Sequence, residues 1–270
     1  MLLLLLCIAQ HPHRLAAKTV RIAFYNGGGA FSGDNKQTHA HEHEFYSAIA
    51  TAGQILRGQN LTTRGIELTN VTEANITSAI TAESRFDVVV FPGGSGTGQS
   101  DALGEGGRAA VRSFVASGGA YIGTCGGAFL AIKHLMLYGN PGPATVEPWA
   151  RGDGTVLMQF TAAGLSSLGQ SVHRFGTKNV SIFYGQGPVV AASSFPPNVS
   201  VLSFYRTEIH SKQTNQTNGT MVNTPAITST QYGRGRVVLN SPHPEIPTKN
   251  GATLPEIYAA ELAWALQLER

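Results

Sequence analysis

The first half of the chain alternates between two patterns of apolar and polar residues. Residues 19–26, 86–94 and 120–124 are short, almost continuously apolar runs that end in a turn, as buried strands do. Residues 44–57 and 107–117 instead carry apolar side chains at helical spacing. Continuously apolar strands are typical of parallel sheets that helices cover on both faces. The pattern therefore predicts a doubly wound α/β domain.

The second half of the chain departs from this alternation. Several short β-type runs follow one another without an obvious helix between them, at residues 155–160, 180–185, 188–193 and 200–205. A hairpin is expected over residues 226–241, with its turn at Gly233–Gly235, and an amphipathic helix over residues 254–268. We therefore expect antiparallel strands to extend the parallel sheet on one side.

Composition supports one globular unit. Of the 270 residues, 42% are hydrophobic and only 13% are charged, which suits a protein with a large core. The net charge of +3 is small and the basic residues are not clustered, so we expect no nucleic-acid partner. Neither an internal repeat nor a linker interrupts residues 18–270, which we interpret as a single domain.

The N-terminal segment and the asparagine motifs point to export. Residues 1–17 begin "MLLLLLCIAQ" and resemble a signal peptide; the apolar run is too short to span a bilayer. Seven Asn-x-Ser/Thr sequons, more than chance placement gives, occur at Asn60, Asn70, Asn75, Asn179, Asn198, Asn215 and Asn218. We expect a secreted or lumenal glycoprotein without a transmembrane span.

This expectation changes the meaning of the cysteines. The chain has two, Cys7 and Cys125, and cleavage of the leader would leave Cys125 alone. A single cysteine cannot form an intramolecular disulfide in an oxidising compartment. Cys125 is then either an inert buried residue or a free reactive thiol.

The surroundings of Cys125 favour the reactive thiol. In "AYIGTCGGAFLA", residues 120–131, a strand of small residues leads into Cys125, which two glycines and an apolar helical run follow. The sequence Gly123-Thr-Cys-Gly-Gly127 fits a nucleophile elbow, where glycines avoid clashes in a sharp strand-to-helix turn. The dipole of the following helix favours the thiolate form. The alternative is a tightly packed strand–helix crossing without chemistry.

A thiol nucleophile needs a base and an oxyanion site. His243 follows a predicted strand, and Pro244 favours an extended backbone there, so Glu245 is expected beside the imidazole. The backbone N–H groups of Gly94 and Gly126 are candidates for holding an oxyanion. Taken alone, each stretch could equally be an ordinary turn.

Together these motifs carry a family resemblance. "FPGG", "GTCGG" and "PHPE", in this order, resemble the class I glutamine amidotransferase-like superfamily, which has a Cys-His-Glu triad on a flavodoxin-like sheet. Longer stretches such as "VVVFPGGSGTGQSDALGEGG" and "GRGRVVLNSPHPE" are similar to the N-terminal domain of eukaryotic biotin–protein ligases and its stand-alone relatives. The resemblance, from about Val20 to Glu245, implies Cys125 as nucleophile, His243 as base and Glu245 as the orienting group.

One departure affects the expected substrate. Glutamine-using members usually have a Gly-His-Gln type segment after the elbow, whereas this chain has "GAFLA" with Phe129 near that place. We therefore expect a hydrolase for an amide, peptide or ester rather than a glutamine-dependent enzyme, and we do not carry over ligase activity. A secreted binding protein with the same fold and a redox thiol at the elbow are the alternatives.

Two further motifs have weaker chemistry. "HAHEHE" places His39, His41 and His43 on alternate residues, which could hold zinc in a strand, but a solvated loop is the simpler interpretation. Gly28 and Gly33 have phosphate-loop spacing, yet Asp34 stands where that motif needs lysine. We expect no cofactor or metal and a small-molecule or peptide substrate; the oligomeric state stays open.

Overall fold

The computed structural model describes residues 19–31, 38–62, 65–81, 86–146, 152–209 and 220–268, without the side chains of residues 38–41. The expected signal peptide, residues 1–17, and the sequons at Asn215 and Asn218 lie outside the described residues. Among the residues searched, no helix combines the length and the apolar character needed to cross a bilayer.

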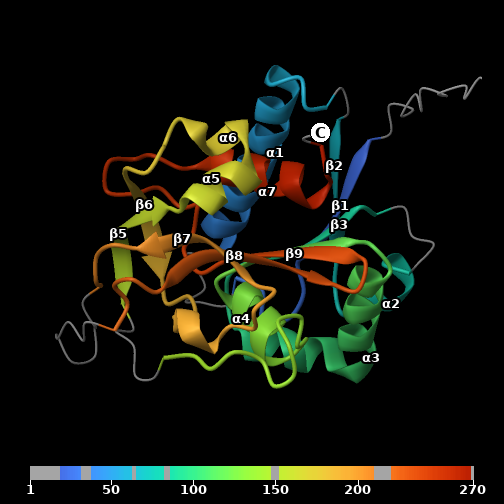
Figure 1. Ribbon diagram of the computed structural model, residues 1–270. Helices are drawn as coiled ribbons and strands as arrows, with labels where there is room; N and C mark the ends of the chain where they lie inside the picture. The colour runs from blue at the N-terminus through green and yellow to red at the C-terminus, as the bar shows by residue number, and fades with distance from the viewer. Residues whose placement is uncertain are drawn as a thin grey trace, which may run out of the picture.

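A single nine-stranded sheet forms the centre of the described part of the molecule (Figure 1). Its strands follow the order β2-β1-β3-β4-β9-β8-β7-β5-β6. The first five strands of this order, β2, β1, β3, β4 and β9, pair in parallel and are called the parallel half here. The remaining four, β8, β7, β5 and β6, pair antiparallel and are called the antiparallel half. Their bounds are β1 (Val20–Tyr25), β2 (Ile66–Val71), β3 (Val88–Phe91), β4 (Ala120–Thr124), β5 (Asp153–Phe160), β6 (Asn179–Gly185), β7 (Ser200–Tyr205), β8 (Pro225–Tyr232) and β9 (Gly235–Asn240).

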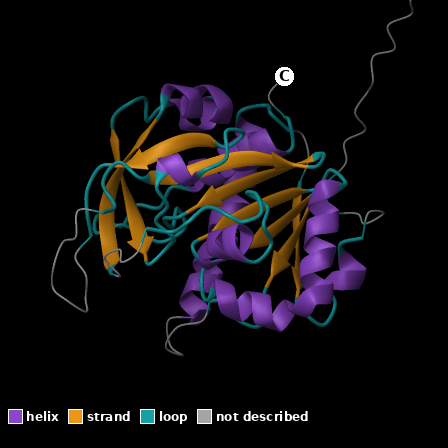
Figure 2. Ribbon diagram, turned by 60° about the horizontal axis from the view of Figure 1, so that its bottom comes forward, coloured by secondary structure: helices purple, strands orange, loops and turns teal. Residues whose placement is uncertain are grey.

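Helices cover both faces of this sheet (Figure 2). One face of the parallel half packs against α2, α3 and α4, and the other face packs against α1 and α7. The antiparallel half packs against α5, α6 and one side of α7. The helices are α1 (Thr38–Gly58), α2 (Ile76–Ala79), α3 (Gly96–Ala116), α4 (Gly126–Lys133), α5 (Ala162–Leu168), α6 (Gln170–His173) and α7 (Pro255–Ala265), with a 3-10 turn η1 (Ala192–Ser194). The expected fold class is thereby confirmed.

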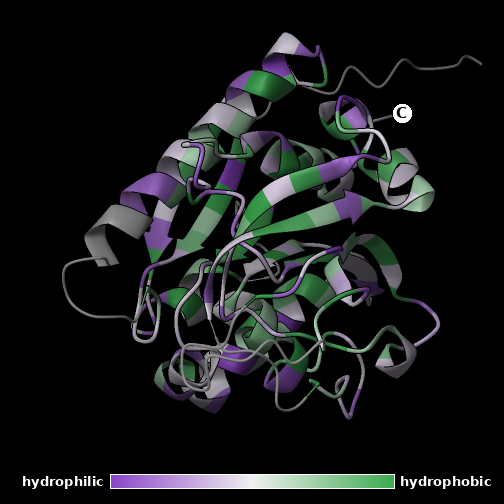
Figure 3. Cartoon of the chain, turned by 90° about the vertical axis from the view of Figure 1, so that its left-hand side faces the viewer, coloured by the Kyte–Doolittle hydropathy of each residue, from purple (hydrophilic) through white to green (hydrophobic). Residues whose placement is uncertain are grey.

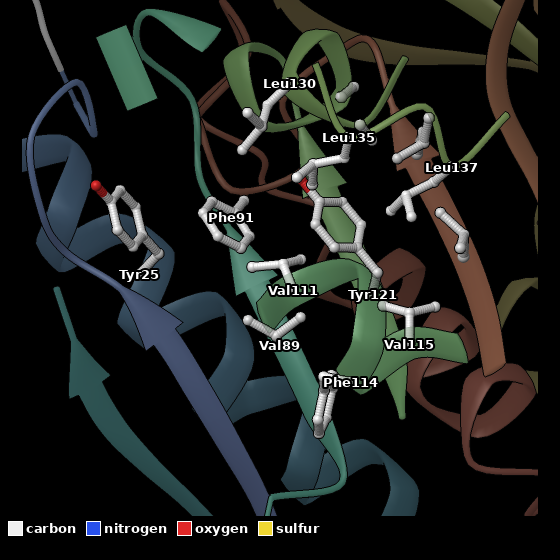
Figure 4. Close-up of a cluster of buried hydrophobic side chains, with 14 of the residues drawn as sticks. Tyr25, Val89, Phe91, Val111, Phe114, Val115, Tyr121, Leu130, Leu135 and Leu137 are labelled. Carbon is white, nitrogen blue, oxygen red and sulfur yellow. The ribbon is translucent and has the colours of Figure 1, made fainter. Parts of the chain in front are cut away.

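The apolar runs become the interior strands (Figure 3), because each lies between two helical layers. All four residues of β3 and all five of β4 are buried. Figure 4 shows the core between this part of the sheet and α3 and α4. Its members include Val89, Phe91, Val111, Phe114, Val115, Tyr121 and Leu130.

Four helices differ from the sequence prediction. Helix α3 begins at Gly96, where Ser95 caps it by accepting a hydrogen bond from the Gly98 N–H (2.9 Å), and it is kinked at Gly104 (φ 59°). The helix predicted from residue 107 is therefore only the segment after this kink. Helix α7 is buried almost all round rather than amphipathic, because it lies between the sheet and helices α1, α5 and α6. Helices α5 and α6 occupy a region where we expected only β structure. The strand expected over residues 188–193 is also absent: Val190 makes an isolated β-bridge with Thr145, and the 3-10 turn η1 begins at Ala192.

The histidine-rich segment is also different from the prediction. Helix α1 begins at Thr38, so "HAHEHE" belongs to its first turns and is neither a strand nor a loop. The strand on which the zinc arrangement considered above depends is therefore not present, while the side chains of His39 and His41 lie outside the described residues. His43 is exposed, and the described residues contain no group of three side chains able to hold a metal.

Candidate functional site

Cys125 occupies the turn between β4 and α4. Its φ of 50° is unusual for a residue with a side chain, and the turn is held because the Cys125 N–H donates to the Asn240 carbonyl (2.8 Å). A Cβ atom at Gly126 would collide with the carbonyl of Gly94, and one at Gly127 with the carbonyl of Phe91. The glycines after Cys125 therefore allow the helix to start directly against the neighbouring strand.

His243 and Glu245 lie just after β9 and meet through their side chains. The Nδ1 atom of His243 is 2.7 Å from Oε1 of Glu245, and both residues are buried. The His243 N–H donates to the carbonyl of Phe183 (2.8 Å), which joins this segment to the end of β6. The Glu245 carboxylate thus orients the imidazole, and the hydrogen bond to Phe183 holds the backbone that carries it.

The imidazole and the thiol occupy the same small space. A Cβ atom at Gly93 would lie 2.9 Å from Cε1 of His243 and 3.6 Å from Cβ of Cys125. A Cβ atom at Gly185, at the end of β6, would lie 3.3 Å from Nε2 of the same imidazole. The Sγ–H of Cys125 donates to the Gly185 carbonyl (3.3 Å). A side chain at Gly93 would therefore displace the imidazole, and one at Gly185 would press against it.

The charges around His243 favour its protonated form. Burial by itself would lower the pKa of His243, but the negative charges of Glu245 and Cys125 and hydrogen bonds to both raise the pKa well above the usual value. An imidazolium beside a thiol stabilises the thiolate and can later donate its proton. This is an arrangement that can carry out nucleophilic and acid–base chemistry.

Two backbone N–H groups lie beside the thiol. A Cβ atom at Gly126 would be 3.0 Å from the nitrogen of Gly94, so the two backbones are in close contact. Within the described part of the chain, neither the Gly94 N–H nor the Gly126 N–H has a hydrogen-bond partner. The loop at Gly94 is fixed because Phe31 N–H donates to Gly93 and Ser95 N–H donates to Gly29, both at 2.9 Å.

A polar network that sequence reasoning missed lies beneath these residues. The Tyr258 hydroxyl of α7 donates to Oε2 of Glu245 (2.7 Å) and lies 3.1 Å from Oγ1 of Thr124. One turn further along α7, Glu261 accepts from Nδ2 of Asn240 (3.0 Å). Burial, opposed by this hydrogen bond and reinforced by the charge of Glu245, raises the pKa of Glu261 to about 8. A glutamate inside the otherwise apolar run "IYAAELAWAL" was the available signal.

The phosphate-loop interpretation has a structural obstacle. The Gly28 N–H, which a phosphate would need, donates to the carboxylate of Glu73 (3.0 Å). Tyr25 donates its hydroxyl to the same carboxylate (3.3 Å). An anionic side chain thus already occupies the start of this loop, while Gly33 and Asp34 lie outside the described residues.

The sheet order, the strand–turn–helix at Cys125 and the position of His243 after the last parallel strand define a protein of the glutamine amidotransferase-like fold class. Within that class, the chain belongs to the family described as biotin-protein ligase, N terminal, whose model matches residues 59–143 and 158–262. This match confirms the resemblance stated from the sequence.

Solved structures agree on the fold. The structure of PurLQS from Thermotoga maritima superposes with a TM-score of 0.59 at 14% identity, covering 91% of this chain and 99% of that one. A putative ThuA-like protein from Bacteroides uniformis superposes with a TM-score of 0.54 at 12% identity, covering 95% and 94%. Among proteins with curated descriptions, none matches the sequence. At these identities the structural likeness concerns the fold alone.

Proposed function

We propose that this protein is a cysteine-dependent hydrolase that acts on an amide, peptide or ester carbonyl. One observation carries the proposal: the imidazole of His243 lies beside Cys125 and 2.7 Å from the carboxylate of Glu245, and the charges of these two partners raise the pKa of His243 against the effect of burial. In this proposal Cys125 is the nucleophile, His243 the acid and base, and Glu245 the group that orients the imidazole.

The reaction would run in two halves. The Cys125 thiolate adds to the carbonyl carbon, and the N–H groups of Gly94 and Gly126 stabilise the oxyanion. The imidazolium of His243 protonates the leaving amine or alcohol as the C–N or C–O bond breaks, which leaves a thioester on Cys125. His243 then takes a proton from water, and the hydroxide adds to the thioester carbonyl. The C–S bond breaks, which releases the carboxylic acid and restores the Cys125 thiolate beside the His243 imidazolium.

The test is the pH dependence of Cys125 alkylation by iodoacetamide, followed on the Cys125 peptide by mass spectrometry. We expect the wild-type thiol to react well below pH 8.5, near which a free thiol titrates. His243→Ala should abolish this reaction at low pH while the reaction at high pH persists. A thiol whose pH profile is indifferent to His243 would contradict the proposal. If the charged pair is present, hydrolysis of amides and esters is screened against Cys125→Ser.

A second candidate is a non-catalytic binding protein of the same fold. It is favoured by the closed state of the site: Cys125 and His243 are each 7% exposed, and the thiol proton is donated to the Gly185 carbonyl. This candidate predicts a thiol that alkylates slowly at every pH. The same alkylation profile therefore separates the two.

We further propose that the protein enters the secretory pathway and is glycosylated. All five sequon asparagines within the described residues are exposed, namely Asn60, Asn70, Asn75, Asn179 and Asn198. Exposure is what the glycosylation machinery needs, although it does not distinguish used sites from unused ones. Protein from a eukaryotic host should shift in gel mobility after glycosidase treatment; an unchanged mobility would contradict the proposal.

A further inference from the structure

We propose that Tyr258 is a positioning residue for Glu245 and that Thr124 ties it to the nucleophile turn. The inference rests on the proposed function, because it concerns how the same three side chains are held. Tyr258 comes from α7, far along the chain from Thr124, and its hydroxyl lies 2.7 Å from Glu245 and 3.1 Å from Thr124. Its role is to support the group that orients the imidazole.

The directions of these hydrogen bonds follow from the available protons. Oε1 of Glu245 faces Nδ1 of His243, so Oε2 is the oxygen left for Tyr258. A tyrosine hydroxyl has a single proton, and Tyr258 uses it to donate a hydrogen bond to the Glu245 carboxylate. The Thr124 hydroxyl must then donate to the Tyr258 oxygen.

The resulting chain of side chains closes on itself. It runs from Thr124 through Tyr258 and Glu245 to His243, whose imidazole lies beside Cys125. Since Thr124 is bonded covalently to Cys125, the carboxylate is anchored to the same turn that holds the thiol. A shift of the carboxylate relative to the thiol would break at least one of these hydrogen bonds.

Tyr258 is suited to remain a donor throughout the working pH range. Burial, the charge of Glu245 and the hydrogen bond to Glu245 raise the pKa of Tyr258 well above its usual value. The hydroxyl therefore keeps its proton at neutral pH and can donate to Glu245. Its ring packs against Phe45, with ring centroids 5.1 Å apart, so replacing the tyrosine by phenylalanine removes the hydroxyl and retains the packing.

Loss of the hydroxyl would leave Oε2 of Glu245 buried without a donor. A buried carboxylate in that state either moves or takes up a proton. Either change weakens its support of the His243 imidazolium, and the thiolate of Cys125 loses part of its partner charge. The consequence is a shift of Cys125 reactivity to higher pH.

The experiment compares pH profiles of Cys125 alkylation in the full chain. Tyr258→Phe should move the midpoint to higher pH by about one unit, a roughly tenfold slower reaction near pH 6.5, with an unchanged rate at high pH. Thr124→Val should produce a smaller shift in the same direction, and Glu245→Gln a larger one. Tyr138→Phe is the matched control, since Tyr138 is also fully buried and its hydroxyl accepts a hydrogen bond from Thr228, with no hydrogen bond to Thr124, Glu245 or His243.

The outcomes separate this inference from the proposed function. If the alkylation profiles of the wild-type protein and of His243→Ala are the same, the hydrolase proposal is overturned. A profile that depends on His243 but is unchanged in Tyr258→Phe and Thr124→Val would overturn the positioning role alone. A shift of equal size in Tyr138→Phe would also overturn it, because the effect would then follow general destabilisation. A thermal unfolding transition shows that each variant is folded. If Tyr258→Phe does not fold, Thr124→Val still tests the positioning role.

Discussion

The two halves of the sheet contribute differently to the candidate site. The parallel half supplies the thiol, at the turn from β4 into α4, and the His243 segment that follows β9. Within the described residues, the antiparallel half contributes no charged side chain to the site. From β6 it provides the Gly185 carbonyl and the Phe183 carbonyl, which accept from the thiol and from the His243 backbone N–H. The chemistry therefore belongs to the parallel half and its enclosure to the antiparallel half.

This division reflects the physics of the two strand types. Parallel strands end together at one edge of the sheet, where the turns that follow them can bring side chains from separate segments into contact. Neighbouring antiparallel strands run in opposite directions, so β6 can bring its C-terminal end to that edge without the long crossover connection that a parallel strand needs. Three experiments test this division, in order of decreasing expected effect.

The largest effect is expected from Gly127→Ala. The new Cβ would collide with the Phe91 carbonyl, so we expect a loss of about 3 kcal/mol in unfolding free energy together with loss of the low-pH alkylation of Cys125. Gly164→Ala creates an equivalent collision in the antiparallel half, with the Leu202 carbonyl, and should cost similar stability without changing the alkylation profile. Denaturant unfolding measures the first quantity; equal alkylation profiles in the two variants would break the comparison.

A control for this pair lies in α3. Gly106 has open space around its Cα, so Gly106→Ala should be neutral or stabilise the protein by about 0.5–1 kcal/mol, because alanine favours the helix. A strong destabilisation there would show that glycine replacement as such, and not the collision, accounts for the loss in Gly127→Ala.

A smaller effect concerns pH and the buried Glu261 beneath the parallel half. Its pKa in the folded protein, about 8, lies above the value of 4.5 expected for the unfolded chain. Its contribution to stability is therefore full below pH 4.5 and is lost as the pH rises toward 8. Between pH 5.5 and 6.5 the raised pKa of His243 adds only a small slope of the same sign, because the unfolded imidazole begins to lose its proton only near 6.5.

Glu261→Gln should remove this slope. We expect the wild-type unfolding free energy to fall by about 1 kcal/mol per pH unit in that window and the variant to stay nearly level, which urea unfolding at several pH values measures. A variant with the wild-type slope would mean that the pH sensitivity lies elsewhere in the molecule.

The smallest effect is expected from Phe183→Ala in the antiparallel half. Its ring meets the His243 ring edge-on with centroids 6.0 Å apart, and its removal should cost about 1 kcal/mol and open the site. The high-pH plateau of Cys125 alkylation should rise, because access improves while the charges stay in place. Phe204→Ala, on β7 and away from the site, is the control: its plateau should equal that of wild type.

Local features of the site were predictable from the sequence. The turn at Cys125 depends on the glycines beside it, and the contact between His243 and Glu245 depends on a spacing of two residues. Both are properties of a short segment. The parallel half was likewise readable, because strands buried on both faces, such as β3, leave continuous apolar runs.

Features that depend on distant segments were not predictable. Nothing near Tyr258 indicates that α7 lies over β4 and brings this hydroxyl to Thr124. The position of Gly185 follows from the order of the antiparallel strands, which apolar patterning does not encode. Helix α3 begins in a glycine-rich stretch at Gly96 with low helix propensity, and tertiary packing prevails there.

The order of these residues along the chain also has a consequence for biosynthesis. A ribosome releases Cys125 long before His243, and Tyr258 later still. The thiol therefore spends the early life of each molecule without the base and the support that would activate it. Under the proposed function, a nascent or interrupted polypeptide therefore carries Cys125 without its activating base, so the thiol does not react with neighbouring molecules before folding is complete.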